Sequence, residues 1–358
     1  ILPLIIINLD NLTATQNALL NDIAVNVRTN FHLLMEEIAR GNEHKLNWIV
    51  SNVASRNKYN SPLFIRCCQL SLIKQIVDTK NSYSVITSDY SLAKVLNNHY
   101  QDIEVSVDIT CTETTLSRIK RYVVPIKLYF DIIIDYIERF IYRSNFVKNN
   151  PGLDKTIPLT LLDNFVIQSE TGEPGSIYNG EYIDRYYTGL LDNLSKSEQK
   201  DIYYLPTPIG FKNSRDAFNV MRGSTTNIII RDDFLTLPDY LEALMHPFRL
   251  FAMQRNQIFH AGMNITPIIR QETYYTCCNS NCLEAILFYR FAYRLAKSEV
   301  KIRLVIEWYE NQVIDKGSIL GFHHYFSKVP VIGYQGYIIS RVLHHYIYPT
   351  DLEKRTGV

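Results

Sequence analysis

Short apolar runs alternate along the chain with longer segments in which apolar residues recur every three or four positions. The run at residues 1–10 precedes a segment, 13–39, whose apolar side chains share one helical face. Two further runs, at 82–88 and 103–109, are separated by a shorter helical pattern. Alternation of strands and helices with short connections is typical of a parallel sheet covered by helices, so this part is predicted to be α/β.

The alternation resumes after a basic, asparagine-rich passage that contains proline and glycine. Three more apolar runs predict strands, at residues 157–168, 201–209 and 227–230. A helix is expected from about Glu181. We therefore predict an N-terminal α/β region over residues 1–142, a linker loop at 143–156 and a second α/β region over 157–358.

The clearest strand–helix–strand unit lies between residues 301 and 336. A β-branched run, 302–306, predicts a buried parallel strand, and a helix-length segment then leads to a second apolar run, 329–333. Polar residues follow both runs. Since ligands bind outside the carboxyl ends of parallel strands, we expect a binding site where these residues meet.

Glu310, Asn311 and Gln312 follow the first strand of that unit, and Tyr334 and Gln335 follow the second. A carboxylate beside two amides could supply a general base and hydrogen bonds to sugar hydroxyls. The start of a helix, with Asn311 as its cap and Glu310 near the positive end of the helix dipole, explains the same residues without a site. Spacing alone leaves both readings open.

Two other positions are candidates for binding. Arg185, in the sequence Asp184-Arg185-Tyr186-Tyr187, could hold a phosphate or carboxylate through two hydrogen bonds, or could simply lie at the surface. Asp233, one of two adjacent aspartates after a predicted strand, could serve a metal or a proton transfer, or could cap the following helix.

Composition excludes several classes of protein. The net charge is +1, from 37 basic and 36 acidic residues, so the chain lacks the positive field of a nucleic-acid-binding protein. Six cysteines are too few for a disulfide scaffold of this length, and without a second ligand pair they predict no zinc site. No Rossmann fingerprint, P-loop, G-x-S-x-G or H-E-x-x-H motif occurs. We expect a cytoplasmic protein.

One apolar segment, from Tyr122 to Ile141, is long enough to consider as a membrane contact. Five charged residues interrupt it, Lys127, Asp131, Asp135, Glu138 and Arg139, so it should not cross a bilayer. It is predicted to be an amphipathic helix. Such a helix packs on the core or lies at the surface of a membrane, which would place the protein peripherally at the inner membrane.

In scattered blocks along most of its length, the chain resembles a family of bacterial surface-carbohydrate biosynthesis proteins related to GT-B-type glycosyltransferases. Blocks lie at residues 47–64, near 165 and at 184–191; the most specific is EWYENQVIDKGSILGF with VIGYQGY, within 307–337. The family has FENQPWEKA and IGYQHSG there. Six residues match, namely Glu310, Asn311, Gln312, Lys316, Tyr334 and Gln335. Val313-Ile314 replaces Pro-Trp, and Gly336-Tyr337 replaces His-Ser.

The resemblance implies Rossmann-like parallel sheets with flanking helices in a GT-B-like arrangement. Because the chain ends at Val358, where a family member would continue, it also implies a C-terminal donor domain that is incomplete or absent. The implied activity is transfer of a hexosyl or CMP-linked sugar from a nucleotide-sugar to a glycan or glycolipid acceptor in surface polysaccharide or lipopolysaccharide synthesis. No metal and no tightly bound cofactor are implied.

On this resemblance Glu310 is the catalytic carboxylate. The substrate-binding residues would be Asn311, Gln312, Lys316, Tyr334, Gln335, Arg185, Tyr186 and Asp233. The alternative is a non-catalytic carbohydrate-binding or scaffolding α/β protein of the same pathway.

Overall fold

The structure is a computed structural model that describes residues 3–57, 59–101, 103, 105–143, 156–253, 256–336 and 349–357. It contains two compact units, each built from separate stretches of the chain. Unit 1 comprises Ile1–Leu128, His246–Asn279 and Ile339–Thr356, and unit 2 comprises Tyr129–Met245, Ser280–Ile338 and Gly357–Val358. The predicted division was contiguous, whereas this one is not. Most of the predicted linker, residues 144–155, lies outside the described residues.

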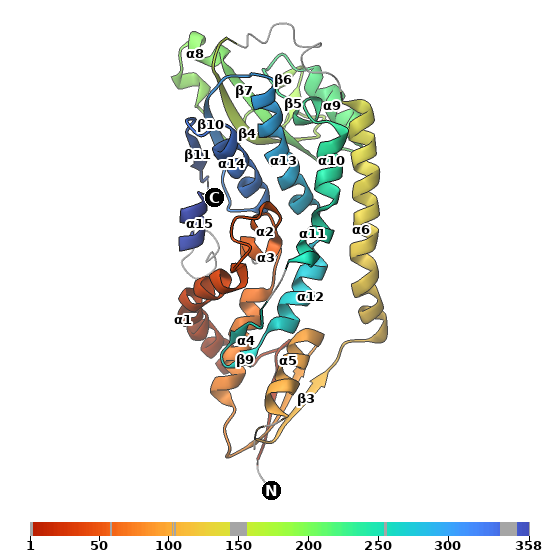
Figure 1. Ribbon diagram of the computed structural model, residues 1–358, viewed down its shortest axis with the longest axis vertical. Coiled ribbons are helices and arrows are strands. Elements are labelled where there is room, and N and C mark those ends of the chain that lie inside the picture. The colour runs from red at the N-terminus through yellow and green to blue at the C-terminus, as the bar shows by residue number, and fades with distance from the viewer. Residues whose placement is uncertain are drawn as a thin grey trace. The chain divides into compact units, whose positions relative to one another are not determined.

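Unit 1 contains a three-stranded parallel sheet. Its strands are β1 (Leu4–Asn8), β2 (Ser82–Thr87) and β3 (Val107–Cys111), which lie side by side in that order (Figure 1). All three were predicted as strands, although β3 begins four residues later than the apolar run. The parallel pairing confirms that this part of the chain is α/β.

Side-chain caps begin three helices of unit 1, namely α1, α3 and α5. In α1 (Ala14–Ala39), the hydroxyl of Thr13 accepts the amide of Gln16, and the Gln16 side chain accepts the amide of Thr13 in return. The predicted apolar face is buried, with Leu20, Ile23, Val27, Phe31, Leu34 and Ile38. The other elements of the unit are α2 (Leu46–Ile49), α3 (Asn52–Ser55), α4 (Leu63–Ile76), α5 (Tyr90–Tyr100), α11 (His246–Ala252), β8 (Phe259–His260), β9 (Met263–Asn264), α12 (Thr266–Thr276) and α15 (Asp351–Thr356).

Unit 2 contains a four-stranded parallel sheet with the order β11-β10-β4-β7. The strands are β4 (Leu159–Ile167), β7 (Ile202–Ile209), β10 (Ile302–Trp308) and β11 (Val331–Tyr334). All four were predicted. Residues 227–230 were also expected to form a strand, but only Ile228 forms an isolated bridge, to Tyr204 of β7.

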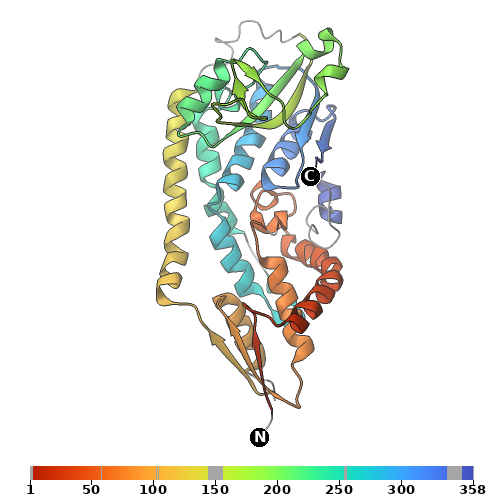
Figure 2. The same ribbon diagram turned by 180° about the vertical axis from the view of Figure 1, so that it is seen from behind.

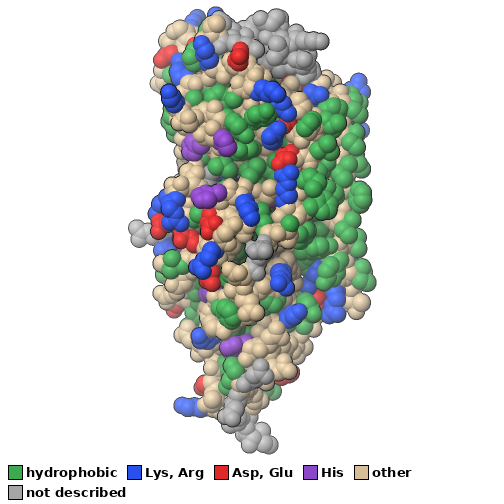
Figure 3. Space-filling model, in the orientation of Figure 1, with side chains coloured by type: hydrophobic (Ala, Val, Ile, Leu, Met, Phe, Trp, Pro, Cys, Tyr) green, Lys and Arg blue, Asp and Glu red, His purple; other side chains and the backbone are tan. Residues whose placement is uncertain are grey.

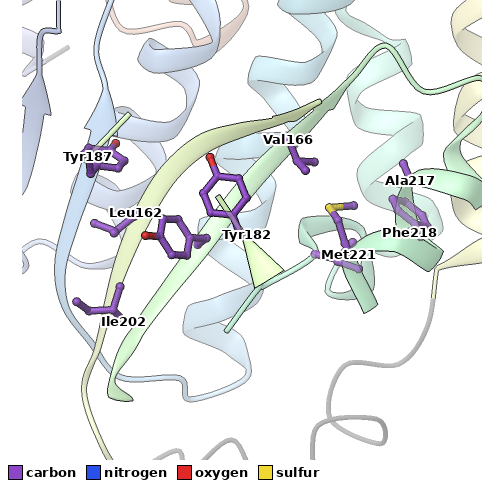
Figure 4. Close-up of a cluster of buried hydrophobic side chains, with 10 residues drawn as sticks. Leu162, Val166, Tyr182, Tyr187, Ile202, Ala217, Phe218 and Met221 are labelled. Carbon is purple, nitrogen blue, oxygen red and sulfur yellow. The ribbon is translucent and has the colours of Figure 1, made fainter. Parts of the chain in front are cut away.

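Helices cover one face of this sheet and an aromatic-rich cluster covers the other. The helices are α13 (Ser280–Lys297) and α14 (Val313–Tyr325), which lie on the same side of the strands in both views (Figures 1 and 2). They pack so closely that a Cβ on Gly317 would lie well inside 3.0 Å of the Ala285 backbone. The cluster on the opposite face includes Leu162, Val166, Tyr182, Tyr187 and Phe218 (Figure 4).

The remaining elements of unit 2 connect these strands. They are β5 (Ile177–Tyr178), β6 (Glu181–Tyr182), η1 (Leu191–Asn193), α8 (Lys196–Lys200), α9 (Ser214–Arg222), η2 (Arg231–Asp233) and α10 (Leu237–Leu244). The helix predicted from about Glu181 is wrong: Glu181 begins the short strand β6, and turns occupy the residues that follow. Gly180 and Gly189, both with positive φ, favour turns over a helix here.

The predicted amphipathic helix is α6 (Thr115–Tyr142), which begins seven residues before the apolar segment. Its packed side carries Pro125, Ile132, Tyr136 and Arg139. Pro125 lies inside the helix on this packed side. Among the described helices, none combines the length and the apolar composition needed to cross a lipid bilayer.

Candidate functional site

The strand order of unit 2 reverses between β4 and β10. From β4 the chain continues to β7 on one side; it then returns to β10 on the other side of β4 and continues to β11. Connections that leave two neighbouring strands in opposite directions open a crevice at the carboxyl ends of those strands, the usual ligand site of open α/β sheets. The order β1-β2-β3 in unit 1 contains no such reversal.

The hydroxyl of Tyr187 bridges the two strands at this reversal. It donates a hydrogen bond to the carbonyl oxygen of Asp163 in β4, at 2.6 Å, and lies 3.3 Å from the carbonyl oxygen of Ile306 in β10. The turn that carries Tyr187 is held by Asp184, whose carboxylate accepts the amides of Tyr186 and Tyr187 at 2.8 and 3.0 Å. The segment 184–187 therefore has a fixed position beside the ends of β4 and β10.

The loop between β10 and α14 has an unusual backbone. Asn311 is fully buried and has φ of +52°, a left-handed conformation that asparagine tolerates better than most residues. The carboxylate of Asp315 in the first turn of α14 accepts the amides of both Glu310 and Gln312, each at 2.9 Å. Gln312, rather than Asn311, is the cap of α14. The three residues are thus a helix start and also a fixed loop at the sheet edge.

Both carboxylate oxygens of Glu310 accept hydrogen bonds. One accepts the indole N–H of Trp308 at 2.9 Å, and the other accepts the side-chain amide of Gln312 at 2.6 Å. Each oxygen keeps a further acceptor position, because a carboxylate has about four. Glu310 is therefore held in one orientation and can still accept a proton or a hydroxyl hydrogen bond.

Four rings form an aromatic group beside Glu310, from Tyr186, Tyr187, Trp308 and Tyr334. The Trp308 ring lies 4.8 Å from that of Tyr186 and 5.7 Å from that of Tyr334, between ring centres. Trp308 and Tyr334 are paired residues of β10 and β11, so the ladder places them on the same face. The ring of Tyr334 remains 45% exposed. This group gives the edge a wide, partly open apolar surface.

Arg185 and Gln335 add polar groups to this edge. The Arg185 side chain is exposed and forms no ion pair within the described part of the chain. Burial raises the pKa of Tyr186, the positive charge of Arg185 lowers it, and the negative charge of Glu310 raises it. The side-chain nitrogen of Gln335 is buried without a hydrogen-bond partner among the described residues.

Three buried acids, which we call the acid cluster, lie on the α14 side of the same strand ends. They are Asp163 of β4, Glu307 of β10 and Asp315 of α14. Burial raises the pKa of Glu307 to about 8, against the hydrogen bond of 2.5 Å that the Ser318 hydroxyl donates to it, and the charge of Asp315 raises it further. Burial raises the pKa of Asp315 to about 7. Burial also raises the pKa of Asp163, and the negative charges of Glu307 and Asp315 raise it further.

None of these three acids forms an ion pair with a described residue, so the cluster retains protons near neutral pH. Sequence reasoning missed it. The available signal was an acidic residue inside an apolar strand, in LLDNFVI for Asp163 and IRLVIEW for Glu307. Such residues are rarely buried without a specific role.

Two predicted site residues have other surroundings. Asp233 forms an ion pair with Arg222 of α9 at 2.7 Å, and no contact in the described part of the chain joins it to Glu310. Lys316 is 1% exposed in the first turn of α14, directly after Asp315. The structure therefore brings Glu310, Gln312, Tyr186 and Tyr334 together around Trp308, while Arg185 and Gln335 are the chain neighbours of Tyr186 and Tyr334 and Asn311 is buried between Glu310 and Gln312 in sequence.

Asp232, next to Asp233, belongs to a separate buried charge network. Its two carboxylate oxygens accept the Arg139 guanidinium at 2.8 and 3.2 Å, and Arg139 also binds Glu284 of α13. Asp232 therefore stabilises the packing of α6 against η2 and α13, whereas Asp233 binds α9. Within the described residues, no group of three or more histidine, cysteine or acidic side chains could hold a metal ion.

The chain has no match among protein-family models, among curated proteins or among solved structures.

Proposed function

We propose that the carboxyl edge of the unit 2 sheet binds a sugar and that the protein is a glycosyltransferase, or the acceptor-binding part of one, in bacterial surface polysaccharide or lipopolysaccharide synthesis. The observation that supports this most is the aromatic group beside Glu310 and Gln312 at the strand reversal. A pyranose ring presents a C–H face, which packs on aromatic rings, and hydroxyls, which pair with carboxylates and amides.

In this proposal the donor is a nucleotide-sugar and the acceptor is a hydroxyl of a glycan or glycolipid. The acceptor oxygen attacks the anomeric carbon, the bond from that carbon to the phosphate oxygen breaks, and the phosphate leaves with the electron pair. Glu310 receives the proton of the acceptor hydroxyl. Arg185, which has no ion pair among the described residues, would stabilise the charge on the leaving phosphate through paired hydrogen bonds.

Transfer assays with CMP-, UDP- and GDP-sugars test the proposal, with calorimetric titration to measure binding. Glu310→Gln should lower turnover by about 100-fold or more, the usual contribution of a general base. Its thermal unfolding should be compared with wild type, because the new amide would face the donors of Trp308 and Gln312. Glu170→Gln, at an exposed position of the same unit, is the matched control. A folded Glu310→Gln protein with near wild-type turnover would exclude this role.

The second candidate is a non-catalytic carbohydrate-binding protein of the same pathway. The hydrogen bonds from Trp308 and Gln312 to both oxygens of Glu310 favour it, because they suit a fixed binding group as well as a base. Glycan binding without nucleotide affinity and without product would support this alternative. Nucleotide-sugar binding with product formation would support the transferase.

A further inference from the structure

Helix α6 carries a continuous apolar stripe on the side that faces away from the protein. The stripe residues recur at three- and four-residue spacing over seven turns: Leu116, Ile119, Val123, Ile126, Phe130, Ile134, Ile137 and Ile141. Each is between 54% and 65% exposed. Figure 3 shows hydrophobic side chains gathered along this helix. At about 100° per residue, the stripe lies opposite the packed side that contains Ile132 and Tyr136.

An exposed stripe of this kind needs an explanation. Monomeric soluble proteins rarely expose contiguous apolar patches larger than a few hundred square ångströms. Specific interfaces bury about 800 Å² on each partner. Eight large side chains, each more than half exposed, offer an area of that order. The stripe is therefore large enough to form a stable contact by itself.

Four charged residues follow one flank of the stripe in an ordered sequence. Lys120 and Lys127 lie in the first half of the helix, and Asp131 and Glu138 lie in the second half. Lys120, Lys127 and Asp131 form no ion pair among the described residues, even though Lys127 and Asp131 are only one turn apart. Glu138 accepts one long hydrogen bond, at 3.4 Å, from the Arg215 amide. The flank is thus basic in one half and acidic in the other.

We infer that α6 pairs with α6 of a second copy of this chain, in antiparallel orientation, to form a homodimer. In an antiparallel pair related by a two-fold axis, the same flank of each helix meets its own reversed copy. Lys120 then faces Glu138 of the second copy, and Lys127 faces Asp131 of the second copy. Both pairs are centred on Tyr129, so a single register satisfies all four charges on each helix.

The apolar stripe agrees with this register. The midpoint between Ile119 and Ile137 is residue 128, and so is the midpoint between Ile126 and Phe130. This midpoint is one residue from Tyr129, on which the charge pairs are centred. Reversed, the stripe therefore meets itself along its whole length. The helix dipoles of an antiparallel pair also oppose each other favourably. This inference rests on α6 alone and is independent of the proposed glycosyl transfer.

A lipid surface fits the same helix less well. Helices that bind anionic membranes carry lysine and arginine along the polar face, whereas this flank has two lysines and two acids. The two carboxylates would be repelled by anionic headgroups. A parallel pairing would set the charged flank against the other flank and leave these charges without partners.

Sedimentation velocity of the full chain tests the dimer. Wild type should sediment as a dimer at micromolar concentration, and Phe130→Asp, next to the proposed two-fold axis, should sediment as a monomer. Leu33→Asp is the matched control, since Leu33 is 62% exposed on α1, and it should remain a dimer. Circular dichroism of each variant establishes that it is folded. A wild-type monomer throughout this range overturns the inference.

Charge reversal and cross-linking test the register. Lys127→Glu should weaken the dimer about tenfold or more, and adding Asp131→Lys should restore it, because the reversed pair is again complementary. A mixture of Ile119→Cys and Ile137→Cys proteins should form the mixed disulfide on mild oxidation. Homodisulfides of Ile119→Cys would show a parallel pair instead. A monomer that floats with anionic vesicles and loses this binding in Phe130→Asp would show that the stripe binds a membrane.

Discussion

The two parallel sheets of the protein differ in strand order, and their carboxyl edges differ accordingly. In unit 1 the strands lie in chain order, and the polar groups after them bind one another. The Asp10 carboxylate accepts the amide of Ser88 at 2.6 Å, and Asp89 caps α5. In unit 2 the order reverses, and the edge retains an exposed Arg185 and an exposed ring at Tyr334. The comparison leads us to expect that strand reversal, rather than polar residues alone, favours a binding edge.

The partly buried Asp89 of unit 1 and the acid cluster of unit 2 differ in how their charge is compensated. Burial acts to raise the pKa of Asp89 in unit 1, but the Arg66 guanidinium and the Leu92 amide outweigh it, and the pKa is lowered. In the acid cluster of unit 2 no such cation is present among the described ion pairs, and burial raises the pKa of Glu307 to about 8. Asp89 is thus held as a charged group by a neighbouring cation. The acid cluster instead keeps protons, as unpaired buried acids at functional sites often do.

The largest effect should come from breaking the paired charges of unit 1. Arg66→Met removes the cation that binds Asp89 and Glu272, the latter at 2.9 Å, and leaves the buried Glu272 and the partly buried Asp89 without their cation. We expect a loss of about 3–5 kcal/mol in the free energy of unfolding. Urea denaturation, followed by circular dichroism, measures it.

Arg185→Met in unit 2 is the matched control for that experiment. Arg185 is exposed and has no ion pair among the described residues, so its loss should change stability by less than about 0.5 kcal/mol. Equal losses in the free energy of unfolding of Arg66→Met and Arg185→Met would contradict the contrast between an arginine in ion pairs and an exposed arginine without one.

A smaller loss is expected from the helix contact that supports the unit 2 edge. In Gly317→Ala the new methyl group meets the Ala285 backbone, so α14 must move away from α13. We expect a loss of about 1–3 kcal/mol. His323→Ala, at an exposed position of the same helix, should change stability by no more than about 0.5 kcal/mol. Denaturation curves that coincide for Gly317→Ala and wild type would show that this contact is not tight.

Much of unit 2 could be predicted from the sequence because local pattern determines it. The β-branched run at residues 302–306 lies within β10, and Glu310–Gln312 follow that strand as expected. Strand order, in contrast, depends on contacts between distant segments. Alternation of apolar runs would be the same for any order, so the aromatic group could not be predicted, since it needs β10 beside both β4 and β11.

The same reason explains which surroundings the sequence alone does not reveal. Asp233 looks the same in sequence whether it faces a ligand or Arg222, because its partner comes from another helix. The division into units also depends on distant contacts, since His246–Asn279 and Ile339–Thr356 return to unit 1. The acid cluster brings two strands and a helix together, and each acid alone is a single irregular position in an apolar run.

Glu307→Gln tests the acid cluster through pH, with a change opposite in sign to that of Arg66→Met. Glu307 has a pKa of about 8 in the folded protein, against an ordinary value of 4.5. Between these values the unfolded chain loses the proton that the folded protein keeps, so wild-type stability falls as pH rises. The glutamine side chain of the variant has no proton to lose and can still accept the Ser318 hydrogen bond.

The gain from Glu307→Gln should therefore be near zero at pH 4, should grow as pH rises, and should level off above pH 8 at on the order of 1 kcal/mol or more. Urea denaturation at a series of pH values measures it. Glu181→Gln, at an exposed position of the same unit, should give no such trend. A gain independent of pH would show that Glu307 does not hold its proton.

The smallest effect on stability, and the most local, should come from Gly336→Ala. A Cβ at this position would lie well inside 3.0 Å of the Trp308 ring, while Gly336 itself is exposed at the end of the sheet. The ring can turn outward, so the loss of stability should stay below about 1 kcal/mol.

Because Trp48 and Trp308 are the two tryptophans, one in each unit, a Trp48→Phe background makes Trp308 the sole reporter. Its emission should shift to the red as the ring enters water, and sugar binding should weaken while unit 1 is unaffected. An unchanged emission spectrum, or a red shift with undiminished sugar binding, would show that the aromatic group does not take part in the proposed sugar site. Glu310 and its amide neighbours would then be the remaining support for that site.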